Sequence, residues 1–385
     1  MSRELMLASR ITGLKPSATV EMTERVRRAR QAGRDIIGLS SGDPNLPTHP
    51  SVIEAAHRAM KDGKTHYGPS PGIPSLRSAI ADRLSLESGN EYVSEQIIIT
   101  PGGKFAVFAG IMSAVEVGDE VILLDPCWVS YGPCVKMAGG IPVVVPALQK
   151  IDPERLEKTI TSRTKLIIVN SPVNPTGRII SKSELETIIR LAEGNNLWIL
   201  YDEVYKNILY EPESRISIQT IENACDRLLV VNSFSKEYGM TGWRIGYLAT
   251  PRDFGKDIRK IIQHSVYCVP PFIQAAAEAA IALPAEIMTA HVAEFKRRRD
   301  LMTAKLNNIP GISCNTPEAT FYLFPAVEQD DWTVATEWLD KLDIAVLPGS
   351  VFGSAGKGHI RISVTSEVHL LEEAVRRIGQ YYADH

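Results

Sequence analysis

A succession of short apolar runs, each followed by a polar turn, constrains the fold of this chain more than any other feature. The runs cover residues 97–99, 121–124, 142–145, 166–169, 197–200 and 228–231, with helical patterning between several of them. They are apolar throughout rather than alternating, which is typical of parallel strands covered by helices on both faces. We therefore expect an α/β fold with a mostly parallel sheet. The segment 244–250 follows the last run after a short loop, so we expect it to return antiparallel.

The regions before and after these runs have a different pattern. Ser17 is placed to cap a helix over 18–32, a short strand is expected at 36–39, and helices are expected at 50–61 and 74–87. Residues 252–308 are mostly helical in pattern, with one long helix from about Pro284. The remainder indicates a smaller α+β unit, with strands near 319–324 and 359–364 and a final helix from Ser366. A chain of 385 residues exceeds the usual size of a single core, so two domains, or one large domain with an appendage, are expected.

Composition excludes several classes of function. The 42 basic and 45 acidic residues give a net charge of −3 without a long single-sign run, which does not favour binding to nucleic acid or membrane surfaces. The five cysteines show no CxxC spacing, so neither a zinc site nor a disulfide framework is expected. The first residues lack the apolar core of a signal peptide, and no apolar run approaches membrane-spanning length. A cytoplasmic location is the expectation.

Polar residues that are unusual for a core follow the ends of the apolar runs. In open α/β sheets, ligands bind in the crevice beyond the carboxyl ends of the strands. Gly102-Gly103 follows the first run and opens a helix, which is a ready anion site made from backbone N–H groups. It is neither a Walker A loop nor a GxGxxG fingerprint, which argues against a nicotinamide dehydrogenase. Trp128, Asn174 and Asp202 follow later runs.

The last run leads directly to Lys236. A partly desolvated lysine loses its proton more easily, and a neutral amine is what a Schiff-base lysine needs. Ser233, Ser235 and Arg244 stand near it in sequence and suit a phosphate monoester. Together these residue types suggest a phosphorylated aldehyde cofactor attached to the lysine. The alternative for Lys236 alone is a solvated lysine in a polar turn.

A pyridine cofactor that serves as an electron sink would use the other strand-end residues. Asp202 can hold the proton on the ring nitrogen, Asn174 and Tyr205 can donate to the ring oxygen, and Trp128 can stack on the ring. Its phosphate needs N–H, hydroxyl and guanidinium groups, which are available from Gly103, Lys104, Ser233, Ser235 and Arg244. Taken singly, Trp128 also fits core packing, Asp202 a helix cap and Arg244 a surface ion pair.

The sequence resembles the class I aminotransferases, the aspartate aminotransferase family of pyridoxal 5′-phosphate (PLP) enzymes with fold type I. The resemblance runs nearly end to end, and its prokaryotic subgroup is indicated by Lys15-Pro16-Ser17-Ala18-Thr19. Its most specific motifs are Asn170-Ser171-Pro172-x-Asn174-Pro175-Thr176-Gly177, Asp202-Glu203-x-Tyr205, Ser233-x-Ser235-Lys236-x-x-x-Met240-x-Gly242-x-Arg244-x-Gly246-Tyr247 and Pro348-Gly349-Ser350-x-Phe352-Gly353, continuing to Gly358-His359-Ile360-Arg361-Ile362-Ser363. It implies a large PLP-binding domain (46–284) with a seven-stranded sheet. An N-terminal arm (1–16) and a small α+β domain (17–45 with 285–385) complete the chain.

The resemblance also implies roles by position. Lys236 would form the Schiff base and move the proton, with Asp202 and Tyr205 as further catalytic residues. The substrate α-carboxylate would be received by Gly42, Asn174 and Arg361, and Thr19 would lie near the substrate side chain. Tyr67 would reach the phosphate of the neighbouring subunit, which implies a homodimer with shared active sites. For Arg361, the alternative is a strand arginine that faces solvent.

The reaction implied is ping-pong transamination between an L-amino acid and a 2-oxo acid. Aspartate with 2-oxoglutarate is the first expectation. Against it, the helix from Phe105 to Met112 carries no further cation or amide, and the segment 267–271 departs from the Ser/Thr-rich stretch expected in such relatives. Both departures would also fit an apolar, aromatic or alanine donor. A PLP-dependent β-lyase and a non-catalytic PLP-binding regulator remain alternatives, although no basic appendage is present for DNA binding.

Overall fold

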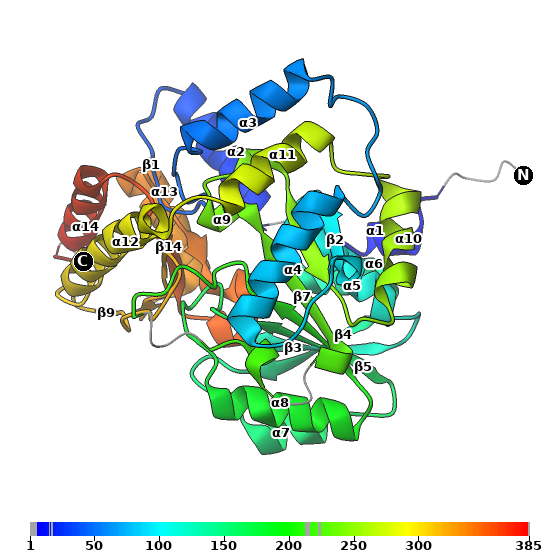
Figure 1. The fold of residues 1–385 in the computed structure, drawn as a ribbon. Helices are drawn as coiled ribbons and strands as arrows, with labels where there is room; N and C mark the ends of the chain where they lie inside the picture. The colour runs from blue at the N-terminus through cyan, green and yellow to red at the C-terminus, as the bar shows by residue number, and fades with distance from the viewer. Residues whose placement is uncertain (1–5, 15, 17, 212–215, 222–224, 384–385) are drawn as a thin grey trace, which may run out of the picture.

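A computed structural model describes residues 6–14, 16, 18–211, 216–221 and 225–383; the predicted capping residue Ser17 lies outside the described residues. Its largest element is a seven-stranded sheet with the strand order β2-β8-β7-β6-β5-β3-β4 (Figure 1). The strands are β2 (Ile97–Thr100), β3 (Glu120–Asp125), β4 (Ile141–Pro146), β5 (Thr164–Asn170), β6 (Trp198–Asp202), β7 (Leu228–Ser233) and β8 (Gly246–Ala249). Each predicted apolar run is therefore a strand.

The sheet is parallel except at one strand. β3 pairs in parallel with β4 and β5, and β6 pairs in parallel with β5 and β7. β8 is antiparallel to both of its neighbours, β2 and β7, as expected for a strand that returns after a short loop. It starts two residues later than predicted because Arg244 adopts a left-handed backbone conformation with φ +54°, which ends the preceding turn rather than beginning a strand.

Helices cover both faces of this sheet, and the strand residues alternate between them. Ile97 and Ile99 pack in one hydrophobic cluster, whereas Ile98 between them packs in another. The first cluster includes residues of α3 (Pro50–Lys61), α4 (Pro74–Ser88), α7 (Pro153–Thr159), α8 (Lys182–Gly194) and α11 (Pro271–Ile281). The second includes residues of α5 (Gly103–Ala114), α6 (Tyr131–Met137) and α10 (Gly255–Ser265). Figure 1 shows α3 and α11 side by side. Most strands are thus buried on two faces, whereas β4, at one edge of the sheet, leaves Ile141 and Val144 exposed.

A second group of elements gathers the N-terminal and C-terminal parts of the chain. Its helices are α12 (Ala285–Leu306), α13 (Asp331–Leu342) and α14 (Val368–Ala383), which lie together in Figure 1. Its strands are β1 (Ile37–Gly38), β9 (Ile312–Ser313), β10 (Tyr322–Leu323), β11 (Ala326–Val327), β12 (Ile344–Ala345), β13 (Leu347–Pro348) and β14 (Ile360–Ser363). β1 pairs in parallel with β12, and β14 is antiparallel to both β10 and β13.

The N-terminal segment contains more helix than the arm that the sequence predicts. α1 (Ser9–Thr12) lies within it, and α2 (Ala18–Gln31) follows. α2 ends just before Gly33, whose φ of +85° favours glycine and stops the helix as predicted. Within the described part of the chain, no single helix has the length and apolar character to cross a bilayer; only α11 and α12 taken together pass such a test, and they are bent by 83°.

Candidate active site

A cavity of about 930 Å³, counting the space at its open mouth, lies where the carboxyl ends of the parallel strands meet the second group of elements. Of the predicted site residues, it is lined by Thr19, Gly42, Gly103, Lys104, Trp128, Asn174, Asp202, Tyr205, Ser233, Ser235, Lys236, Arg244 and Arg361. Tyr67 is the predicted residue that does not line it. Tyr131, Asn170, Val204 and Tyr322 line it in addition, without having been assigned a role from the sequence.

Lys236 lies in α9 (Phe234–Glu237), a single helical turn that follows β7 directly. The side chain of Ser233 caps this turn by accepting from the N–H of Ser235. The Lys236 Nζ donates to the carbonyl of Gly42 at 2.6 Å. Burial lowers the pKa of Lys236 to about 8, and the cations Arg361 and Arg244 act in the same direction. The amine is therefore much more easily deprotonated than an exposed lysine.

Asp202 ends β6 and is buried at the base of the cavity. Burial raises its pKa to about 6, although the hydroxyl of Tyr131 donates to Oδ2 at 2.6 Å and favours the charged form. The N–H of Val204 approaches Oδ1 at 3.3 Å, and Asn170 donates to the Asp202 carbonyl at 2.8 Å. A carboxylate held in this way suits a cationic partner such as a protonated ring nitrogen.

Tyr205 and Tyr322 form a pair of buried hydroxyl groups in the cavity. Their oxygens lie 3.1 Å apart, and their rings meet edge to face. Burial raises the pKa of Tyr205 well above the usual value, so its hydroxyl keeps the proton that it can donate. Tyr322 is 117 positions further along the chain, in β10, and the local sequence gives no sign of this contact.

Arg361 in β14 is the most confined cation of the cavity, with 2% of its surface exposed. Its guanidinium donates to Oδ1 of Asn174 at 3.1 Å and to the carbonyl of Ser40 at 2.7 Å. It lies 4.2 Å from the ring centroid of Tyr322 and 4.9 Å from that of Phe352. Its Nε has no hydrogen-bond partner, and no carboxylate of the described residues pairs with it. A buried, unpaired guanidinium of this kind calls for a carboxylate ligand.

The predicted phosphate site is a cradle at the N-terminus of α5. The first N–H groups of a helix have no partner within the helix and attract anions. Gly102 has φ +85°, a backbone conformation that favours glycine, and a Cβ there would also stand 2.6 Å from Nη2 of Arg244 and displace that side chain. The hydroxyl oxygens of Ser233 and Ser235 lie 2.8 Å apart beside the same cavity.

Lys104, Trp128 and Thr19 form part of the cavity wall away from its base. The Lys104 Nζ lies 5.2 Å from the ring centroid of Trp128, a cation–π contact that holds the amine over the indole. Trp128 packs edge to face on Tyr131, which fixes its ring orientation. Thr19 reaches the cavity from α2. The Lys104 side chain thus stands in the cavity, separately from its backbone N–H at the start of α5.

Tyr67 lies outside this cavity. It is 86% exposed, and its ring packs edge to face on Tyr267 with the centroids 5.0 Å apart. Tyr267 is itself 49% exposed and has a positive φ of 64°. Within one subunit Tyr67 therefore contributes nothing to the site.

These residues fit PLP. The cavity brings together a lysine with a lowered pKa, a buried carboxylate, a cradle of N–H and hydroxyl groups for an anion, and an arginine without a carboxylate partner. The chain belongs to the aminotransferase class I and II family, whose sequence model matches residues 34–378. It is accordingly a PLP-dependent aminotransferase with the type I fold, which confirms the predicted family, fold, cofactor and reaction.

Individual relatives cover almost the whole chain. An aspartate aminotransferase of Geobacillus stearothermophilus is 36% identical over 98% of this chain and 99% of its own. A probable aspartate/prephenate aminotransferase of Aquifex aeolicus is 37% identical over 97% of each chain. Among solved structures, the aspartate aminotransferase from Thermus thermophilus with maleate has a TM-score of 0.92 at 36% identity and covers 98% of this chain and 100% of its own.

Proposed function

We propose that this aminotransferase uses L-aspartate as the amino donor and 2-oxoglutarate as the acceptor in a ping-pong cycle. The names of the bacterial relatives support aspartate. The Thermus structure, at 36% identity, is described with maleate, a dicarboxylate. The Aquifex relative's name adds prephenate, which also carries two carboxyl groups. A site for dicarboxylates is common to all three.

The balance of charge in the cavity carries this proposal. Among the described residues that line it, four are cations (Lys104, Lys236, Arg244 and Arg361) and one, Asp202, is an acid. Arg244 stands at the phosphate cradle, Lys236 is the reacting amine, and Arg361 is left for the α-carboxylate. Lys104 is then the cation available for a second carboxylate on the substrate side chain. An apolar or aromatic donor would leave that amine without an anionic partner.

The chemistry that PLP supplies when bound is an aldehyde that condenses with amines and a ring that accepts the electron pair left at the substrate carbon. The protein's own groups hold and move the proton. Roughly a tenth of the Lys236 amine is neutral at pH 7 for a pKa of about 8. Its Nζ takes the α-proton of the substrate as a general base and then returns it. Asp202, with a pKa of about 6, is mostly ionised at pH 7 and would hold the ring nitrogen of bound PLP in its protonated form.

Hydroxyl, amide and guanidinium groups orient the reactants. Tyr205 and Asn174 are placed to donate to the ring oxygen, and the Tyr322 hydroxyl supports Tyr205 at 3.1 Å. Arg361 receives the α-carboxylate, and its stacking on Tyr322 restricts its motion. The α-hydrogen is thereby presented to Lys236. Orientation of this kind, together with the electrostatic stabilisation by Asp202, accounts for the rate in this proposal.

The active enzyme is proposed to be a homodimer with shared active sites. Tyr67 and Tyr267 form an exposed aromatic pair, and Met6 and Leu7 in the N-terminal segment are 89% and 73% exposed. Exposed apolar groups of this size favour burial against another chain. In the proposed dimer, Tyr67 supplies its hydroxyl to the phosphate cradle of the partner's site.

The division into a large domain (46–284) and a small domain (17–45 with 285–385) is likewise proposed. One hydrophobic cluster is built mainly from residues after 294 and joins Ile37 and Leu39 to them. The two clusters on the faces of the seven-stranded sheet lie within 52–280. Limited proteolysis that cuts first near residue 284 would support this division, and early cuts inside the sheet region would oppose it.

A panel of amino donors tests the substrate. With 2-oxoglutarate as acceptor, kcat/KM should be highest for aspartate and lower for alanine, leucine and phenylalanine. Lys104→Met should reduce kcat/KM for aspartate roughly tenfold or more, by loss of one charge-assisted hydrogen bond, and leave alanine nearly unchanged. A higher kcat/KM for aromatic or apolar donors, or release of pyruvate and ammonia from a cysteine conjugate, would refute the proposal in favour of another aminotransferase or a β-lyase.

A further inference from the structure

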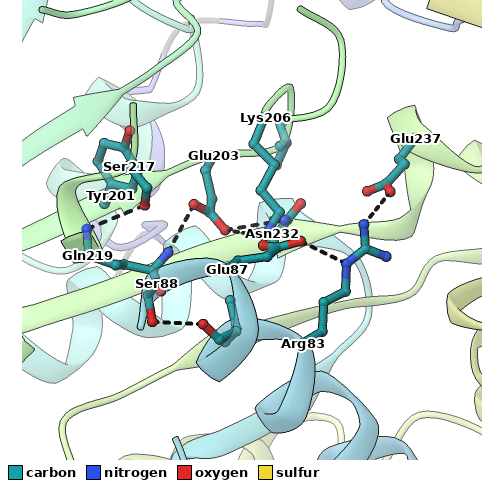
Figure 2. A network of polar contacts seen from close by, with 12 residues as sticks. Arg83, Glu87, Ser88, Tyr201, Glu203, Lys206, Ser217, Gln219, Asn232 and Glu237 are labelled. Carbon is teal, nitrogen blue, oxygen red and sulfur yellow. Dashed lines mark hydrogen bonds and ion pairs between the residues drawn. The ribbon is translucent and has the colours of Figure 1, made fainter. Parts of the chain in front are cut away.

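A second polar cluster lies behind the active site and is shown in Figure 2. Its charged centre is Lys206, whose Nζ donates to Glu203 Oε1 at 2.7 Å and to Glu87 Oε2 at 2.8 Å. Gln219 also donates to Glu203, at 3.0 Å. Lys206 is 8% exposed and Glu203 1%, and neither side chain lines the active-site cavity.

Arg83 extends this cluster to a third element. Its Nε donates to Glu87 at 2.9 Å, and its Nη2 donates to Glu237 at 2.8 Å. A continuous chain of ionic contacts therefore runs from the end of β6 across α4 to α9 (Figure 2). We call Arg83, Glu87, Glu203, Lys206 and Glu237 the back network.

On the β6 side, members of the back network alternate with cavity residues. Glu203 directly follows Asp202, and Lys206 directly follows Tyr205. Asp202 and Tyr205 line the cavity, whereas Glu203 and Lys206 point away from it into the network. The short turn 202–206 thus presents two side chains to the cavity and two to the back network. The contacts on both sides determine the position of its backbone.

After β7, too, a member of the back network directly follows a residue of the cavity, here the reacting lysine. Glu237 directly follows Lys236, and Arg83 holds it from α4. Asn232, next to Ser233, approaches Glu203 at 3.5 Å. The two strand ends that carry the catalytic carboxylate and amine are consequently joined by one set of charges, of which Glu203, Lys206 and Glu237 are buried and Arg83 and Glu87 are half-buried.

The charges of this network are strongly coupled. Burial on its own would lower the pKa of Lys206, but Glu203, Tyr247 and Glu87 together raise it well above its usual value. Lys206 is therefore a permanent cation between two carboxylates. Removing one member of a buried ion pair is far more disruptive than removing an exposed one, because the remaining charge stays buried.

We propose that Lys206 is a positioning residue, which holds the turn 202–206 and, through Glu87 and Arg83, the Lys236 turn in the arrangement that receives PLP. This rests on the proposed roles of Asp202, Tyr205 and Lys236. Lys206 itself touches neither cofactor nor substrate. Arg361 is not part of the back network and meets the turn 202–206 only indirectly, through Tyr322, so we expect Lys206 to affect the binding of the substrate carboxylate less than it affects PLP.

The test compares Lys206→Met with Lys206→Arg. Lys158→Met serves as the control, since Lys158 forms an exposed ion pair with Glu154 at 3.2 Å on α7. The Kd for PLP is measured by fluorescence titration of each apoprotein, at a temperature where circular dichroism shows it folded. The kcat and KM for aspartate are then measured with saturating PLP. Lys206→Met should weaken PLP binding and lower kcat, each about tenfold, as loss of residues that orient ligand-binding groups does elsewhere.

The KM for aspartate should change less than twofold in Lys206→Met, Lys206→Arg should recover most of the loss, and Lys158→Met should match the parent protein. The inference is refuted if Lys206→Met is folded and binds PLP and turns over like the parent, with only its melting temperature lowered. If Lys206→Met does not fold, Glu203→Gln, which keeps the side-chain shape, is judged by the same criteria. If the parent protein binds PLP but does not transaminate aspartate, the proposed substrate is wrong, and the Kd values for PLP still decide the inference about Lys206.

Discussion

Replacing Arg361 by lysine tests how the site holds its substrate. The guanidinium is fixed by Asn174 at 3.1 Å and Ser40 at 2.7 Å, between the rings of Tyr322 and Phe352. Lysine keeps the charge but loses the planar pair of donors that matches a carboxylate. One charge-assisted hydrogen bond contributes about 1.5–3 kcal/mol. We therefore expect kcat/KM to fall roughly 10- to 150-fold, since each 1.36 kcal/mol is a factor of ten.

The assay is steady-state kinetics with aspartate, glutamate and alanine as donors. Because every amino acid carries an α-carboxylate, the loss should be similar for all three and should appear mainly in KM. The Kd for PLP should stay within about twofold of the parent value, because Arg361 does not belong to the phosphate cradle. This measurement is the control for a general disruption of the folded site. A fall in kcat/KM confined to aspartate and glutamate would refute the assignment. Arg361 would then bind the side-chain carboxylate instead of the α-carboxylate.

Two further predictions concern the reacting lysine and Tyr67, its proposed neighbour from a second subunit. In the apoprotein, the acylation rate of Lys236, followed by peptide mass spectrometry, should rise with pH with a midpoint near 8, because burial favours the neutral amine. A midpoint of about 10, the ordinary value for a lysine side chain, would contradict this. Mixing inactive Tyr67→Ala and Lys236→Ala subunits should restore activity in proportion to the mixed dimers, since one site then carries both native residues; no recovery in mixtures shown to exchange subunits would contradict the shared site.

The sequence predicted the site best where a reactive side chain directly follows a recognisable strand. Continuous apolar runs predicted β2 to β7, and the parallel arrangement brings their carboxyl ends to one edge of the sheet. Asp202 ends β6 and Lys236 follows the end of the neighbouring strand β7, so the two side chains had to lie near each other. Their altered pKa values follow from the same burial that makes the strands recognisable.

Other features could not be predicted because they depend on contacts between distant segments. Tyr322 meets Tyr205 only after the second group of elements packs on the sheet. Glu203 and Lys206 look like ordinary solvated charges in a polar turn, and only the packing of α4 over that turn buries them. The role of Tyr67, which the resemblance implies, stays a prediction, because a single subunit shows only its exposed aromatic pair with Tyr267.

The backbone after β1 has a consequence for how this enzyme can vary. The carbonyl of Ser40 accepts from Arg361, and the carbonyl of Gly42 accepts from Lys236. A side chain at Gly42 would also meet the Tyr322 hydroxyl at 2.8 Å. Three consecutive residues thus set the distance between the group that grips the substrate and the group that deprotonates it. Substrate range can change at Lys104 or Thr19 without altering that distance, whereas a shift of the backbone at 40–42 alters binding and turnover together.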